Sequence, residues 1–169
     1  MARNRHYMNP YLDSNVFLGW LRRPPEIIDG VNRQEISRHI LTLAEQGMFS
    51  IFTSTFTLAE VYKKRSGKIL SENENKSVLL DFGKYLENRW IQLIDVDRGI
   101  GELANKLCLE YIEIPIYPHD AIHLACALQG KCDVLLTWDG PLLKVIRPDI
   151  RIEKPQINSG HPLFDDLSD

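Results

Sequence analysis

The segment from Pro118 to Asp139 constrains the fold of this chain more than any other. Residues 121–128 are apolar almost all the way around a helix, with His123 as the exception, and a helix of this kind is buried rather than amphipathic. After a short break at residues 130–131, Val134-Leu135-Leu136 forms a continuous apolar run. Such a run suits an interior strand of a parallel sheet. The segment therefore predicts a buried helix followed by a buried strand.

The remainder of the chain alternates strand and helix patterns. Strands are expected at residues 11–12, 49–54, 90–94, 134–136 and 150–152, and helices at 16–21, 36–44, 55–65, 71–86, 97–109 and 121–128, with a short helical turn at 142–144. A loop is expected from Pro24 to about Gly30. This alternation predicts an α/β fold in which helices cover both faces of a parallel sheet. We expect one domain over residues 1–154 and a loose tail over 155–169, which is rich in Pro, Gly, Ser and Asp.

Four acidic residues adjoin the apolar elements, and these are Asp13, Glu60, Asp120 and Asp139. Asp13 and Asp139 each follow an expected strand, while Glu60 and Asp120 lie near the start of expected helices. Ligands of open parallel sheets bind outside the carboxyl ends of the strands. We therefore expect these acids to converge at one edge of the sheet, with a local turn bringing Asp120 there.

Each acid also has a purely structural interpretation. Asp13 and Asp120 would each cap a helix, and Thr57 with Glu60 fits a capping box. The sequence Asp139-Gly140-Pro141 is typical of a turn. Asp97 and Asp133 are weaker candidates, because the first caps a helix and the second precedes its strand. The case for a function rests on convergence and not on any single residue.

Carboxylates crowded into one pocket repel each other, so at least one stays protonated unless a cation intervenes. Mg²⁺ prefers oxygen ligands and combines a few carboxylates with water and substrate phosphate. The chemistry that follows most naturally is metal-assisted hydrolysis of a phosphodiester. His119 and His123 are spaced to share a helix face, which suggests zinc as an alternative, but a catalytic zinc site wants three protein ligands and no third is evident.

Charge and cysteine content narrow the class of protein. The net charge is −3, so any contact with nucleic acid must come from local basic patches. Lys63, Lys64 and Arg65 follow Glu60 directly and would suit contacts to phosphate, although a solvated helix face explains them equally well. The three cysteines form no Cys-x-x-Cys pair, which favours reduced thiols in a cytoplasmic protein. We find neither a signal peptide nor a membrane span in the sequence.

The sequence resembles the PIN-domain nucleases in four segments taken together. These are Leu-Asp-Ser-Asn-Val-Phe at 12–17, Thr-Leu-Ala-Glu-Val at 57–61, His-Asp-Ala-Ile-His-Leu-Ala-Cys-Ala at 119–127 and Leu-Leu-Thr-Trp-Asp at 135–139. Within this family the chain is most similar to the VapC-like toxins of toxin–antitoxin pairs. No single segment is specific, and it is their order and spacing over residues 10–153 that carry the resemblance.

The resemblance implies a parallel sheet in the strand order 3-2-1-4-5 and an endoribonuclease that depends on Mg²⁺ or Mn²⁺. Asp13, Glu60, Asp120 and Asp139 match the acidic quartet of the family. We expect Asp13 and Asp120 to hold most of the metal, with Asp139 bound to it directly or through water, and Glu60 to orient or deprotonate the attacking water. Ser14 and Thr137 match the small hydroxyl residues that support the quartet. A homodimer and a small antitoxin that blocks the acidic pocket are the implied partners, and RNA is the implied substrate.

Two other functions fit parts of the sequence. One is a catalytically silent module of the same fold that binds RNA or protein, although such a module would be expected to lose one of the four acids. The other is a phosphatase or receiver-like domain with an acceptor aspartate. Asp13 is followed by Ser-Asn-Val and no Asp-x-Asp occurs there, which argues against the acceptor aspartate.

Overall fold

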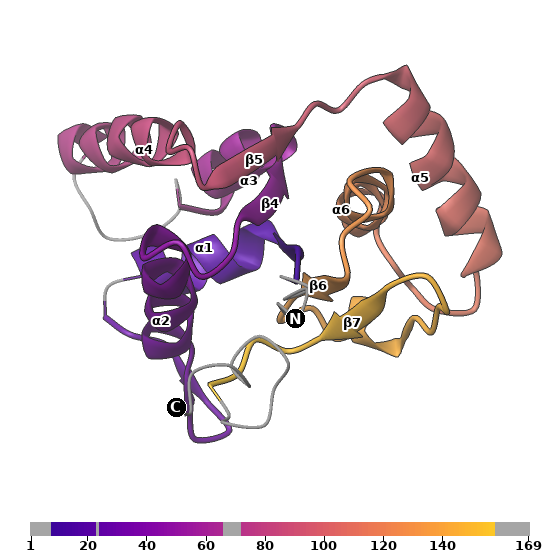
Figure 1. Cartoon of the computed structure of the whole chain (residues 1–169), viewed down its shortest axis with the longest axis horizontal. Coiled ribbons are helices and arrows are strands. Elements are labelled where there is room, and N and C mark those ends of the chain that lie inside the picture. Colours follow the sequence, from indigo (N-terminus) through magenta and orange to yellow (C-terminus); the bar gives the residue numbers. More distant parts are fainter. Residues whose placement is uncertain (1–7, 23, 66–71, 158–169) are drawn as a thin grey trace, which may run out of the picture.

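A five-stranded parallel sheet forms the centre of the computed structural model, which describes residues 8–22, 24–65 and 72–157, with side chains excepted at 62–65 and 72–75 (Figure 1). The strands of this sheet are β1 (Pro10–Leu12), β4 (Ile51–Ser54), β5 (Ile91–Ile94), β6 (Val134–Leu136) and β7 (Arg151–Glu153). Their spatial order is β5-β4-β1-β6-β7, and every neighbouring pair is parallel. In order along the chain this is 3-2-1-4-5, as expected.

Helices cover both faces of the sheet. They are α1 (Ser14–Leu21), α2 (Arg33–Glu45), α3 (Phe56–Arg65), α4 (Glu72–Leu86), α5 (Arg98–Glu110), α6 (Pro118–Gln129) and the short 3₁₀ turn η1 (Leu142–Lys144). Figure 1 shows α1 to α4 on one side of the sheet and α5 with α6 on the other. Among the described residues, no helix is long and apolar enough to cross a membrane.

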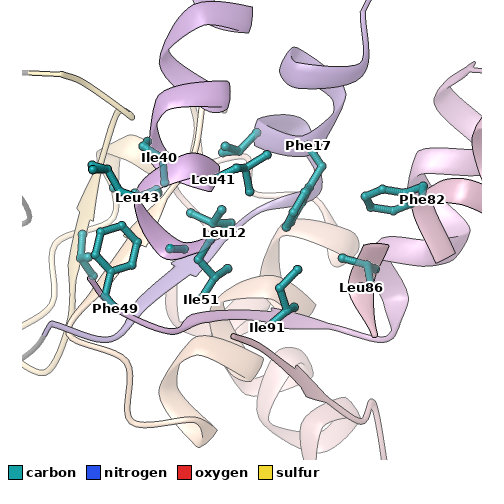
Figure 2. Packing of buried hydrophobic residues seen from close by; sticks show 14 of the residues in the cluster. Leu12, Phe17, Ile40, Leu41, Leu43, Phe49, Ile51, Phe82, Leu86 and Ile91 are labelled. Carbon is teal, nitrogen blue, oxygen red and sulfur yellow. The ribbon is translucent and has the colours of Figure 1, made fainter. Parts of the chain in front are cut away.

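Alternation along the central strands divides the interior into two cores. Leu12 and Leu136 point into the core beneath α1 to α4, whereas Tyr11 and Leu135 point into the core beneath α5 and α6. Figure 2 shows the first of these cores, where Leu12 lies among side chains from the sheet and the covering helices. Because successive side chains of a strand point to opposite faces, the short strands β1 and β6 contribute to both cores.

The expected helix at 121–128 is confirmed as α6, which begins three residues earlier. Its side chains from Ala121 to Ala127 are buried apart from Ile122, which is partly buried, and His123 is fully buried among them. A helix that is apolar almost all the way around is thus buried, as predicted. The boundary of the tail at 154/155 stays a prediction, because most of residues 155–169 lie outside the described part.

One expectation was wrong. The segment between Pro24 and Gly30 is not entirely loop, because β2 (Ile27–Ile28) pairs with β3 (Val31–Asn32) in a small antiparallel hairpin. The two residues that join the strands, Asp29 and Gly30, have φ angles of 53° and 76°. Asp-Gly is a favoured pair for such a turn because it tolerates positive φ at both positions.

Two glycine substitutions should have opposite effects on stability. Gly30→Ala places a Cβ at a positive φ, so the free energy of unfolding should fall by roughly 1 kcal/mol. Gly101→Ala, on an exposed turn of α5 with open space around its Cβ, should raise it by roughly 0.5–1 kcal/mol. Urea unfolding of both variants measures this. Equal effects of one sign would contradict the left-handed turn.

Candidate active site

Asp13 lies where β1 ends and α1 begins, and its carboxylate receives several donors. Thr137 Oγ1, from the end of β6, donates to Asp13 Oδ2 at 2.6 Å. Asn15 Nδ2 donates to the same oxygen at 2.6 Å, and the backbone amide of Asn15 donates weakly to Oδ1 at 3.4 Å. Asp13 is 2% exposed. It is therefore both the helix cap that the structural interpretation required and a buried acid at the carboxyl edge of the sheet.

Asn15 joins the two central strands at this edge. Its side-chain amide also donates to Thr137 Oγ1 at 3.0 Å, and its side-chain oxygen accepts from the Trp138 amide at 3.0 Å. Asn15 was not among the predicted site residues. The signal available was its place directly after Asp13 and Ser14, in the segment that resembles the PIN domain.

Glu60 enters the pocket from the neighbouring strand–helix unit. Thr53 Oγ1 on β4 donates to the Leu12 carbonyl at 2.9 Å and lies 2.8 Å from Thr57 Oγ1 at the start of α3. These contacts fix the first turn of α3 against the central strand. Ser14 Oγ donates to Glu60 Oε2 at 2.5 Å and lies 3.2 Å from Asp13 Oδ1, so its hydroxyl adjoins both carboxylates. Glu60 is 8% exposed.

His123 was not among the predicted site residues and had been considered only as a zinc ligand, yet it lies in the pocket. Its Nε2 lies 2.7 Å from Glu60 Oε2 and 3.4 Å from Asp13 Oδ1, and the Tyr11 hydroxyl lies 2.8 Å from Nδ1. A carboxylate only accepts hydrogen bonds, so Nε2 carries a proton and donates to Glu60. Burial by itself lowers the pKa of His123, but the nearby Asp13, Glu60 and Asp120 carboxylates outweigh it and raise that pKa.

Among the described residues, the ligand atoms of Asp13, Glu60 and His123 lie within 4.8 Å of one another, as in a metal site. His123 Nε2 would have to lose its proton before it could bind an ion, whereas the two carboxylates are ready ligands. Asp120 and Asp139 lie outside this group. Asp120 Oδ2 accepts from the Tyr117 amide at 3.0 Å, and Asp139 Oδ1 accepts from the Leu142 amide at 2.8 Å. Asp120 is thus the third residue of α6, where its carboxylate accepts from the cap residue Tyr117, and Asp139 lies in the turn before η1, so both acids also have a structural role.

Electrostatics nevertheless connect Asp120 to the pocket. Its pKa is raised from 3.8 to about 6, first by burial and then by the negative charge of Asp139, with a smaller contribution from Asp13. Asp120 is 3% exposed. The repulsion expected among crowded acids is thus present between Asp120 and the acids at the ends of the two central strands. It would be relieved by a cation.

The outcome for the other candidates is mixed. Ser14 and Thr137 contact Asp13 as hydroxyl supports, and Asp97 caps α5 through the Ile100 amide at 2.9 Å. Asp133 bonds to the Asn9 amide at 2.8 Å, at the opposite edge of the sheet. The helix α3 includes Lys63, Lys64 and Arg65, but their side chains lie outside the described residues, so the phosphate contacts stay a prediction.

The fold and this acidic edge define a parallel-sheet α/β protein with a buried carboxylate site. The sequence model of the PIN domain matches residues 11–146, and the chain belongs to the PIN-domain family. A search of curated proteins finds no significant match.

Solved structures of similar fold come from toxin–antitoxin systems. VapBC from Salmonella typhimurium bound to DNA has 21% identity and a TM-score of 0.62, covering 87% of this chain and 98% of that chain. VapBC2 from Rickettsia felis, bound to a DNA fragment from its promoter, has 20% identity, a TM-score of 0.61 and the same coverage. VapC20 of Mycobacterium tuberculosis, a toxin that cleaves the sarcin–ricin loop, has 14% identity, a TM-score of 0.57 and covers 79% of this chain and 92% of that chain. At these identities the likeness establishes the fold.

The contact between His123 and Tyr11 can be measured by a double-mutant cycle. His123→Phe removes the partner of Glu60 and of the Tyr11 hydroxyl, so it should lower the free energy of unfolding by roughly 2–4 kcal/mol. Tyr11→Phe alone should cost roughly 1–2 kcal/mol, because it removes a buried partner of Nδ1. In the His123→Phe background it should be neutral or stabilising, since an orphaned hydroxyl disappears. Additive losses in urea unfolding would contradict the contact.

Asp120 should make the stability of the metal-free protein depend on pH. Because its pKa in the fold is raised to about 6, the fold favours its protonated form, and stability falls as the pH rises from about 4 through 6. Asp120→Asn should remove this dependence on pH. Between pH 4 and pH 7 the free energy of unfolding of the variant should therefore rise by up to about 3 kcal/mol relative to that of the wild type. Urea unfolding in EDTA at both pH values measures the difference. If the free energies of unfolding of variant and wild type differed by the same amount at pH 4 and at pH 7, the raised pKa of Asp120 would be contradicted.

Proposed function

We propose that this protein is a metal-dependent endoribonuclease that hydrolyses phosphodiester bonds of RNA. The observation that carries the proposal is the buried acidic edge, where Asp13, Glu60 and Asp120 are each less than a tenth exposed. Nothing in the packing of a stable domain requires several acids to be buried together, because burial of charge is unfavourable unless it is paired. Membership in the PIN-domain family and the fold shared with VapC toxins support the same function.

The donor set suits a hard divalent cation, Mg²⁺ or Mn²⁺. Its atoms are mainly carboxylate oxygens, which such ions prefer, and the pKa of Asp120 is raised by burial and then by the negative charge of Asp139. Asp13 and Asp120 would hold the ion, with Asp139 bound to it directly or through water. The ion, when bound, would polarise the scissile phosphate and stabilise the charge on the leaving oxygen.

The side chains around Glu60 prepare it to act on water. Ser14 Oγ and His123 Nε2 both donate to Oε2, so these two side chains fix the position of the Glu60 carboxylate. In the proposed reaction Glu60 orients the attacking water and accepts one of its protons as the new bond from oxygen to phosphorus forms and the bond from phosphorus to the leaving oxygen breaks. Asp13, fixed by Thr137 and Asn15, keeps its position without a change of rotamer.

The proposal extends to biological role and partners. VapBC from Salmonella typhimurium and VapBC2 from Rickettsia felis are complexes, and a toxin–antitoxin complex from Klebsiella pneumoniae matches as well. By analogy this chain would be the toxin of such a pair in the cytoplasm, inhibited by a small antitoxin protein and forming a homodimer. Co-expression with the product of the adjacent gene, followed by size-exclusion chromatography with light scattering, tests both the antitoxin complex and the homodimer.

Cleavage of RNA should depend on the acidic quartet. Asp13→Asn and Asp120→Asn should each lower the rate of cleavage of a single-stranded RNA at least a hundredfold, because they remove charge that positions the ion. EDTA should abolish cleavage by the wild type, and added Mg²⁺ or Mn²⁺ should restore it. Asp81→Asn, which removes one exposed acid on α4, is the matched control and should leave the rate unchanged.

The same proteins separate metal binding from turnover. With Mg²⁺ at ten times its dissociation constant, the wild type should melt roughly 3–6 °C higher, and Asp13→Asn should lose this shift. A wild type that binds RNA and shows the thermal shift, yet cuts no RNA, would identify the alternative, a catalytically silent PIN-like module. Quartet variants as active as wild type, with or without chelator, would exclude hydrolysis at this site.

A further inference from the structure

Two aromatic rings lie face to face beside the first turn of α6. Tyr117 and His119 flank Pro118, and their ring centroids are 5.5 Å apart with an angle of 8° between the planes. Tyr117 is 60% exposed, and the His119 side chain is 40% exposed. A parallel, offset pair of rings is a favourable stacking arrangement, and here much of the pair remains open to solvent.

Stability of the fold does not account for the Tyr117 ring. Both hydrophobic cores of the described residues are formed without it, including the partly buried side chains that pack against them. Tyr117 precedes α6 as its cap residue, but the contact with the helix is made by its backbone amide, which donates to Asp120 Oδ2 at 3.0 Å. Any residue other than proline supplies that donor. The aromatic side chain is therefore in excess of what the helix start needs.

The ring pair adjoins the acidic site. His119 Nε2 lies 3.4 Å from Asp120 Oδ1, so the inner ring of the pair contacts one of the four acids, while Tyr117 extends from it into solvent. The negative charges of Asp139 and Asp13 in turn raise the pKa of Asp120. A polynucleotide whose phosphate reaches this edge would thus bring a neighbouring nucleotide within reach of the pair.

We propose that Tyr117, supported by His119, is a stacking surface for an unpaired base of the substrate, next to the phosphate that is cut. This inference rests on the proposed function and refines it to single-stranded RNA or an unpaired loop. Every base has a π face, so stacking on an aromatic ring tolerates many sequences while requiring that the base be free of a duplex. Direct contact with phosphate, by contrast, would not distinguish single-stranded RNA from duplex RNA.

The kinetic test uses Tyr117→Ala with a single-stranded RNA and with the same sequence in a duplex. Loss of one base stack should raise KM for the single strand roughly five- to a hundredfold with little change in kcat, because stacking holds substrate and transition state alike. The preference for single strand over duplex should fall by a similar factor. Tyr117→Trp and Tyr117→Phe should have a KM close to that of the wild type, because both keep an aromatic ring. If the hydroxyl had a structural role instead, Tyr117→Phe would have a raised KM.

A binding test keeps this inference apart from turnover. A ten-nucleotide single-stranded RNA carries 2-aminopurine at each position in turn, and is titrated with the Glu60→Gln protein, in which cleavage is expected to be blocked. Stacking quenches the fluorescence of 2-aminopurine, so one position should be quenched, and adding Tyr117→Ala should abolish the quench. Replacing that nucleotide by an abasic one should lower affinity for the protein with Tyr117 but not for Tyr117→Ala.

The control variant is Ile112→Ala, which trims another exposed apolar side chain in the connection between α5 and α6. It should change neither KM nor the quench. If the wild type cuts no RNA, the proposed function fails. If the wild type cuts RNA but Tyr117→Ala keeps its KM and its quench, the stacking surface alone is overturned. Unchanged RNA binding with an altered oligomeric mass would instead assign Tyr117 to a protein interface and overturn it too.

Discussion

The hydrogen bond from Thr137 to Asp13 is the interaction on which the arrangement of the acidic edge depends. It joins the ends of β1 and β6, two strands that neighbour each other in the sheet yet lie more than a hundred residues apart in the chain. Asn15 extends the connection to the backbone of Trp138. With both strand ends fixed, the acid at the end of β1 and the turn that holds Asp139 keep their relative positions. The pocket is thus a product of sheet pairing and not of a flexible loop.

The elements of the fold could be predicted from the sequence because their patterns have physical causes that are local. An apolar run of three residues at 134–136 has no alternative to burial, and the nearly uninterrupted apolar character of 121–128 places α6 under the sheet. Asp13 and Asp139 could be assigned to one edge because both follow strands of a parallel sheet, whereas Asp120 precedes its strand and needed a local turn to reach that edge. The strand order itself came from the family resemblance, since local patterns do not say which strands become neighbours.

The role of His123 could not be derived in this way. Periodicity identified it as the single polar residue on a buried helix, but not that its two ring nitrogens would meet Tyr11 and Glu60, from two other elements. Those partners are 112 and 63 residues away in sequence. The hairpin at residues 27–32 was missed for another reason, because two strands of two residues are too short to show alternation. Its one signal was the Asp-Gly pair in the turn.

The contact between Tyr11 and His123 makes the second core part of the pocket. Tyr11 belongs to the core beneath α5 and α6, and its hydroxyl ends on an imidazole whose other nitrogen holds Glu60. Any shift of α6 along the sheet would therefore move His123 and, through its hydrogen bond, the Glu60 carboxylate. In this chain the packing of the core beneath α6 therefore helps to set the position of Glu60 at the acidic edge, so a change of volume in that core would alter the geometry of the pocket.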